Sequence, residues 1–269
     1  MKILGVHGIG NYRPDETPES ASASLSRIWT AGLAAAGGRH DVTVAYYSDL
    51  LRVRGRQGDD SDLGDLTAVE EEFLRCLLEG QPLELPGVPQ GRLTAWLRAM
   101  ISTLASSRAC SERFVEWLLV RFAKEAVAYL SPGGARDAVQ ERLRAALQRH
   151  QPEVVLAHSL GTVATYEILH ESAGPSVPLW ITLGSPLAFP KAVFERLTPA
   201  PREGRGTRPH RVGRWANLAD PGDLVAVPIG GVSRCFAGVD SDDHDVIHAW
   251  DFHKAGNYLK SRRLARLLG

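Results

Sequence analysis

A strand-like run that passes directly into a turn and a helix limits the fold of this chain more than any other feature. The run Glu153-Val154-Val155-Leu156 is apolar after its first residue and does not alternate polar with apolar side chains. Such a run is typical of a strand buried on both faces, as in a parallel sheet covered by helices. A helical pattern begins at Thr162. Strand, turn and helix together predict an α/β fold.

Further segments repeat this alternation of short apolar runs and longer helical patterns. The predicted strands cover residues 2–6, 42–46, 154–157, 179–183, 214–218 and 233–236, and the predicted helices cover residues 20–35, 135–150, 163–172 and 255–268. Because strands alternate with helices along the chain, we expect a doubly wound, mainly parallel sheet of about six strands.

The chain before Val154 is longer than a strand crossover requires. About 105 residues separate it from the second predicted strand, whereas a crossover needs about a dozen residues including its helix. Apolar residues recur at helical spacing in residues 96–104 and 114–122. We therefore predict one domain over residues 1–269, with an inserted, mainly helical segment at residues 55–134. Its helices either pack on the sheet and on each other or form a lid over an acyl-binding pocket.

Composition narrows the possible partners. Lys plus Arg equals Asp plus Glu at 31 each, so the charge balance favours neither nucleic acid nor an anionic membrane. No apolar run reaches the roughly 18 to 20 residues that span a bilayer, so no transmembrane segment is expected. The N-terminal apolar run is too short for a signal peptide, which predicts a cytoplasmic location. Three cysteines without C-x-x-C spacing give no reason to expect a metal or other cofactor.

The turn after the strand places Ser159 between two small residues, Ala157 and Gly161. A catalytic serine on a strained strand-to-helix turn needs small residues two before and two after it, because the chain there passes close to itself. A serine that only caps the helix is the alternative. The run Ala157-His158-Ser159-Leu160-Gly161-Thr162 resembles the lipase and esterase branch of the α/β-hydrolase superfamily, with Ala157 replacing the first glycine of G-x-S-x-G.

This resemblance covers residues 2–47 and 135–269 and implies a nucleophile followed by an acid and then a histidine. A serine hydroxyl needs such partners because it is a weak nucleophile until a base removes its proton. Asp223 precedes Leu-Val-Ala, similar to the D-x-V run that carries the acid in many lipases, and is the candidate acid. Asp220 precedes a proline, where an Asx turn is the natural structural role, and is the alternative acid.

Three histidines after the last predicted strand are candidates for the base. His253 enters the terminal helix and resembles the family's His-x-x-Tyr arrangement with a longer spacing, so it is preferred. His248 and His244 are the alternatives. His244 belongs to the acidic run at residues 240–245, whose carboxylates would suit a hard cation. The spacing matches no known ligand loop, so we expect a solvated loop there and no metal.

Two backbone N–H groups should stabilise the oxyanion of acyl transfer. The residue after the nucleophile, Leu160, supplies one. The segment Val6-His7-Gly8-Ile9-Gly10 looks like the His-Gly segment of lipases, which assigns the other to Ile9. A phosphate-binding loop is the alternative, but the third glycine of the dinucleotide pattern is missing. Because this strand opens the chain, the resemblance implies a truncated α/β-hydrolase sheet in the order second, first, third, fourth, fifth, sixth.

Taken together, these residues predict a serine hydrolase that cleaves a carboxylic ester through an acyl-enzyme, without cofactor or metal. The expected partner is a small-molecule acyl ester with an apolar acyl group, and not a nucleic acid. A thioesterase or acyltransferase is the alternative within enzymes, because the same groups accept a thioester or an alcohol. The alternative from another class is a non-catalytic module that binds a lipid or a protein through the inserted helices.

Overall fold

One parallel sheet organises the molecule. The computed structural model describes residues 1–52, 62–81, 93–171, 174–227, 230–245 and 253–269. Every pairing in its six-stranded sheet is parallel, in the order β2-β1-β3-β4-β6-β8. Its strands are β1 (Lys2–Val6), β2 (Asp41–Ala45), β3 (Val154–His158), β4 (Val177–Leu183), β6 (Val212–Ala219) and β8 (Ser241–His244). The predicted doubly wound, mainly parallel sheet is confirmed. A separate pair joins β5 (Gly206–Thr207) to β7 (Phe236–Ala237).

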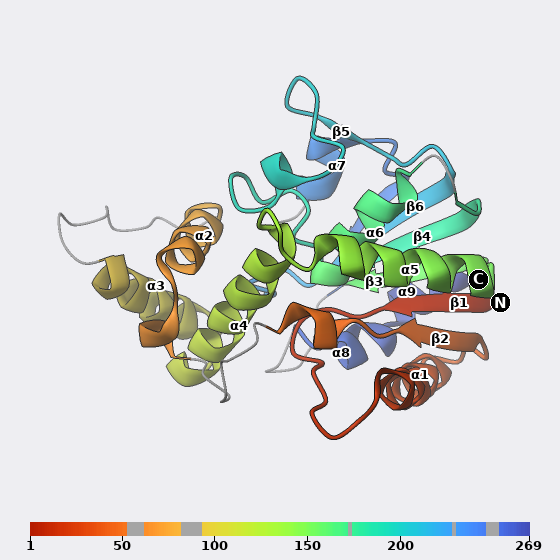
Figure 1. Cartoon of the computed structure of the whole chain (residues 1–269), viewed down its shortest axis with the longest axis horizontal. Coiled ribbons are helices and arrows are strands. Elements are labelled where there is room, and N and C mark those ends of the chain that lie inside the picture. Colours follow the sequence, from red (N-terminus) through yellow and green to blue (C-terminus); the bar gives the residue numbers. More distant parts are fainter. Residues whose placement is uncertain (53–61, 82–92, 172–173, 228–229, 246–252) are drawn as a thin grey trace.

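Helices cover both faces of this sheet (Figure 1). Successive residues of β3 show why: Leu156 packs in one core cluster with Trp29 and Leu264, whereas Val155 packs in the other with Leu143, because strand side chains alternate between faces. The first cluster holds α1 (Pro18–Ala35), α8 (Ala255–Leu259) and α9 (Arg262–Leu268), and the second holds α5 (Arg136–His150) and α6 (Leu160–Leu169).

Three of the described helices between β2 and β3 lie within residues 55–134, the predicted insertion. They are α2 (Ala68–Glu79), α3 (Leu93–Arg108) and α4 (Glu112–Leu130). Figure 1 shows them grouped on the side of the molecule away from the two chain termini. Their apolar residues, including Leu97, Met100 and Leu119, are buried and continuous with the core that contains α5 and α6. Residues 55–61 and 82–92 of the predicted insertion lie outside the described part, and a lid role for these helices stays a prediction.

In the described part of the chain, we find no helix with the length and apolar character that a membrane crossing requires.

The strand order reverses between β1 and β3, and this reversal fixes where a site can form. Val6 at the end of β1 pairs with Ala157 near the end of β3. The residues that follow, the 7–11 loop after β1 and Ser159 after β3, therefore emerge side by side. The connections from these strands lead to opposite parts of the sheet, and in open α/β folds ligands bind beyond the carboxyl ends of the strands at such a point.

The predicted strand at residues 233–236 is wrong. That stretch is mostly helix α7 (Gly231–Cys235), and it begins after Gly230, whose φ of 67° is left-handed backbone that favours glycine. Ser233 N–H donates to Asp242 Oδ2 at 2.8 Å. This fixed side-chain acceptor stabilises the short helix, although Val232 and Phe236 at its two ends favour a strand.

The sixth strand is instead β8, in the acidic run predicted to be a solvated loop, and that prediction is corrected. β8 pairs with β6 from Ala216–Ser241 to Ala219–His244. An edge strand needs no continuous apolar face, and charged side chains suit it. Asp242 Oδ1 accepts a 2.8 Å hydrogen bond from Asn217 Nδ2, and Asp243 forms an ion pair with Arg263.

The predicted terminal helix over residues 255–268 is also corrected, because two helices occupy it. α8 ends at Leu259 and α9 begins at Arg262. Between them Ser261 caps α9, and its hydroxyl accepts hydrogen bonds from the N–H groups of Arg263 and Leu264.

Candidate active site

Ser159 lies on a strained turn between β3 and α6. Its φ of 53° and ψ of −128° are unusual for a residue with a side chain. Small neighbours allow this turn: a Cβ at Gly161 would lie 2.5 Å from the carbonyl oxygens of both Val6 and His7. Ala157, which replaces the first glycine of the motif, is buried without such a restriction. The predicted sharp strand-to-helix turn is therefore present.

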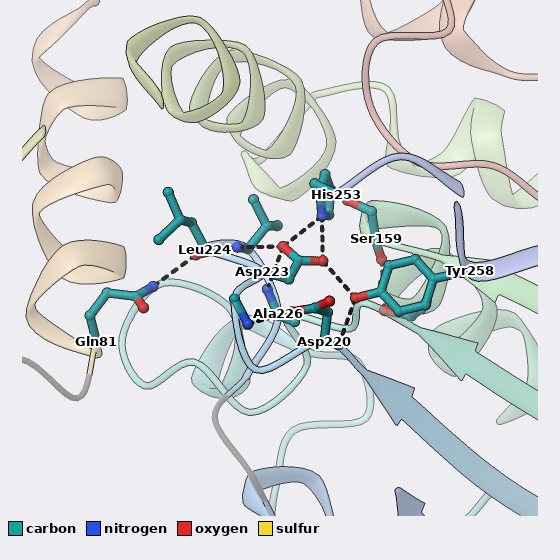
Figure 2. Close-up of polar contacts among 11 residues, drawn as sticks. Gln81, Ser159, Asp220, Asp223, Leu224, Ala226, His253 and Tyr258 are labelled. Atoms are coloured by element: carbon teal, nitrogen blue, oxygen red, sulfur yellow. Dashed lines mark hydrogen bonds and ion pairs between the residues drawn. The ribbon is translucent and has the colours of Figure 1, made fainter. Parts of the chain in front are cut away.

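His253 joins the serine to an aspartate. His253 Nδ1 lies 2.8 Å from both Oδ1 and Oδ2 of Asp223, and its Nε2 lies 2.8 Å from Ser159 Oγ. A carboxylate can only accept, so Nδ1 carries the hydrogen, and Nε2 of the neutral ring accepts from the serine hydroxyl. These three residues are distant in sequence and come from the ends of β3 and β6 and from the segment before α8 (Figure 2).

The Asp223 carboxylate is held by several further donors (Figure 2). Oδ1 accepts from the N–H groups of Val225 and Ala226 at 3.0 and 3.3 Å, and Oδ2 accepts from the Tyr258 hydroxyl at 2.8 Å. These bonds replace the water that the buried carboxylate loses. They also fix the carboxylate plane in which His253 is bound.

Tyr258 was not singled out as a functional residue by the sequence. Its buried hydroxyl donates to Asp223 and accepts from Asp220 N–H at 3.0 Å. Burial, together with the negative charge of Asp223, raises the pKa of Tyr258 well above its ordinary value, so the hydroxyl remains a donor. The only sequence signal for it was the tyrosine of the family-like pattern that begins at His253.

The alternative acid and bases occupy other positions. Asp220 Oδ1 accepts from Gly222 N–H in the Asx turn that the sequence suggested, and His253 contacts Asp223. His244 lies in edge strand β8, and its Nε2 is buried without a partner among the described residues. His248 lies outside the described residues.

The 7–11 loop packs directly against the candidate nucleophile. A Cβ at Gly8 would lie 2.5 Å from Ser159 Cβ, so only glycine fits at this contact. Ile9 follows and is buried, and Leu160 begins α6. Within the part of the chain that the structure describes, neither the Ile9 nor the Leu160 N–H donates a hydrogen bond to the protein. Both donors are therefore available to an incoming oxygen.

Side-chain hydrogen bonds of Asn11 and His7, the latter with the Tyr47 backbone N–H, hold the 7–11 loop in place. Asn11 Nδ2 donates to the carbonyls of Gly8 and Ile9, both at 3.0 Å. His7 Nε2 accepts from Tyr47 N–H at 3.1 Å, so Nδ1 carries the hydrogen and donates to the Gly8 carbonyl at 2.8 Å. Burial lowers the pKa of His7 from 6.5 to about 4, which keeps this tautomer neutral.

A second buried histidine, His158, lies between this loop and the candidate base. Its ring is tilted against that of His253, with centroids 4.8 Å apart. Neither ring nitrogen has a well-aligned hydrogen-bond partner among the described residues. Burial, and then the nearby His253, lower the pKa of His158 well below its ordinary value. A neutral ring places no competing positive charge beside His253.

The residues around Ser159 shield it from solvent. The Ser159 side chain has no exposed surface, so a substrate reaches Oγ only when covering groups move. Ser185, the other serine near the site, exchanges a 2.9 Å hydrogen bond with Thr162 and supports the turn. No group of three or more histidine, cysteine and acidic side chains within the described ranges could hold a metal ion.

No protein-family model, curated protein or solved structure matches this chain. The geometry of Ser159, His253 and Asp223 is therefore what indicates the function of this chain.

Proposed function

We propose that this chain is a serine hydrolase of the α/β-hydrolase type that cleaves carboxylic esters through an acyl-enzyme. The observation that carries the proposal is the continuous chain of contacts from Ser159 Oγ through His253 to Asp223, each at 2.8 Å. Nucleophile, base and orienting acid are the three roles that acyl transfer to a serine requires.

The contacts define the proton path. His253 Nε2 takes the hydroxyl proton as Ser159 Oγ attacks the ester carbonyl, and the resulting imidazolium is stabilised by Asp223. His253 then gives that proton to the alcohol oxygen as the carbon–oxygen bond breaks, which leaves an acyl group on Ser159. In deacylation a water molecule gives a proton to His253 as it attacks the acyl carbon, and the proton then returns to Oγ as the bond between the acyl carbon and Oγ breaks and the carboxylic acid is released.

The tetrahedral oxyanion would be bound by the N–H groups of Ile9 and Leu160. Support comes from the two uncommitted donors and from the close packing of Gly8 on Ser159. Donors that are fixed before the reaction cost no reorganisation when charge develops, and one such donor typically contributes about 2.7 to 4 kcal/mol. The burial of Ser159 strengthens these interactions by excluding water.

Active-site labelling tests the proposal. A fluorophosphonate probe reacts with an activated serine, so we expect the parent protein to be labelled and Ser159→Ala to remain unlabelled over several hours. Ser185→Ala is the matched control, because Ser185 is equally buried but bonded to Thr162, and it should retain the label. Absence of a Ser159-dependent label in folded parent protein would contradict the proposal.

Turnover then identifies the acyl substrate. We expect hydrolysis of aryl esters, with a dependence on acyl-chain length. Preference for acyl thioesters, or transfer to an added alcohol in place of water, would reassign the same residues to a thioesterase or an acyltransferase.

A further inference from the structure

One largely buried carboxylate of the inserted helices contacts the loop beside the candidate nucleophile. Glu125 of α4 accepts a 3.0 Å hydrogen bond through Oε1 from Gly10 N–H, across 115 residues of sequence. The same oxygen accepts from Arg121 Nε at 3.1 Å. The Arg121 side chain also lies against Gly10, with Nε 3.7 Å from where a Cβ would be. The inserted segment is thus bound to the 7–11 loop.

The bond acts on the peptide unit next to the proposed oxyanion donor. The Ile9 carbonyl and the Gly10 N–H belong to one planar unit. Asn11 Nδ2 holds the carbonyl at 3.0 Å, and Glu125 holds the N–H at 3.0 Å. In the preceding unit the Gly8 carbonyl is bound by His7 and Asn11. The Ile9 N–H belongs to this preceding unit and points opposite to the Gly8 carbonyl, as in any trans peptide. The contacts to the two units together therefore set the direction of Ile9 N–H.

The carboxylate is kept at a cost in stability. Glu125 Oε2 is buried and has no hydrogen-bond partner among the described residues. Burial raises the pKa of Glu125, and Arg121, the Gly10 N–H and Arg52 only partly oppose this. Burial raises the pKa of Tyr47, and the nearby negative charge of Glu125 raises the pKa of Tyr47 further. A buried polar group that is only partly satisfied is unfavourable for folding, and such groups are found mainly where function requires them.

We infer that Glu125 is a positioning residue for the proposed oxyanion hole, through which inserted helix α4 keeps the Ile9 N–H directed at the acyl carbonyl. The inference rests on the proposed function and gives the insertion a part in catalysis. A second contact agrees with it: Gln81, at the end of α2, donates through Nε2 to the Leu224 carbonyl at 2.8 Å, next to Asp223 (Figure 2). The insertion is therefore bound to the loops on both sides of Ser159.

Three substitutions at one position test this role. Glu125→Ala removes the acceptor, Glu125→Asp withdraws it by one methylene group, and Glu125→Gln keeps an oxygen that can accept from Gly10 N–H. We expect kcat for an aryl ester to fall about 10- to 100-fold in the alanine variant and less in the aspartate variant, with KM nearly unchanged. The glutamine variant should recover most of the kcat, because the acceptor and not the charge positions the loop.

Glu116→Ala is the matched control. Glu116 lies on the same helix and also accepts a 3.0 Å bond from a backbone N–H, that of Leu63, so its loss should lower stability without lowering kcat. Each kcat is expressed per site labelled by fluorophosphonate at completion, which corrects for misfolded protein. If Glu125→Ala does not fold, Glu125→Asp and Glu125→Gln give the same comparison.

The two proposals fail in different ways. A labelled parent whose Glu125→Ala and Glu125→Asp variants keep the parent kcat, or lose kcat only in proportion to stability as the Glu116 control does, would overturn the role of Glu125. Failure of Glu125→Gln to recover kcat would also overturn it. A parent without Ser159-dependent labelling would instead overturn the hydrolase proposal, and this inference with it.

Discussion

His7 should make the stability of this protein depend on pH in the weakly acidic range. The buried ring is neutral, and protonation would place a hydrogen on Nε2 against the Tyr47 N–H that now donates to it. Burial lowers the pKa of His7 to about 4 in the folded state, against 6.5 in an exposed histidine. A lowered pKa means that the unfolded chain binds the proton more tightly, so this stabilisation is complete above about pH 6.5 and is lost as the pH falls toward about 4.

The size of the effect follows from the two values. The difference between 6.5 and about 4 corresponds to about 3 kcal/mol when the pH falls below both values. Between about pH 7.5 and about pH 5.5, the expected loss of unfolding free energy from this group alone is about 1.3 kcal/mol.

Urea unfolding of the parent and His7→Gln at these two pH values measures the effect. The variant is expected to be less stable at both, but its free energy of unfolding should fall by about 1.3 kcal/mol less than that of the parent. His210→Gln, at an exposed loop histidine, is the control and should keep the parent's pH dependence. Equal pH dependence in the parent and His7→Gln would refute the reasoning, as would an NMR titration in which the His7 ring of the folded parent titrates near 6.5.

Three further predictions concern the site and its turn. Asp223→Asn should lower kcat for ester hydrolysis by about 10⁴-fold, because an amide can stabilise the wrong His253 tautomer; an equal loss in Asp220→Asn would contradict the choice of acid. Tyr258→Phe should lower the urea-derived unfolding free energy by about 1 to 3 kcal/mol, since Asp220 N–H loses its buried acceptor; no loss would show that another group replaces the hydroxyl. Gly161→Ala should lower the unfolding free energy by about 1 to 3 kcal/mol or more in the same assay, because the new Cβ would meet two carbonyl oxygens. Gly256→Ala, with open space around it, is the control for that substitution.

The sequence by itself determined the parallel sheet and the turn at Ser159, and the family resemblance implied the order of the first five strands. These depend on local properties: uninterrupted apolar runs indicate strands buried on both faces, and small residues around one serine indicate a tight turn. The resemblance to lipases implied that the 7–11 loop lies beside Ser159, and the parallel pairing of β1 with β3 brings the two together at the same edge of the sheet.

Local patterns failed where neighbours far along the chain decide the conformation. Residues 241–244 form strand β8 because β6 offers an unpaired edge and Asn217 and Arg263 bind its aspartates. Nothing in the composition of that acidic run distinguishes it from a solvated loop. Residues 233–236 lie between Val232 and the strand-favouring Phe236, but Gly230 and Asp242 favour a helix there.

Only the tertiary structure decided which aspartate faces His253 and which residues support the site. Asp220 and Asp223 lie three residues apart on one turn, and the Tyr258 hydroxyl of α8 binds the carboxylate of Asp223 but only the backbone N–H of Asp220. Glu125 reaches Gly10 across 115 residues, and no spacing in the sequence predicts that contact. A side chain's direction is set by packing across the sheet and the inserted helices, and this information is distributed over the whole fold.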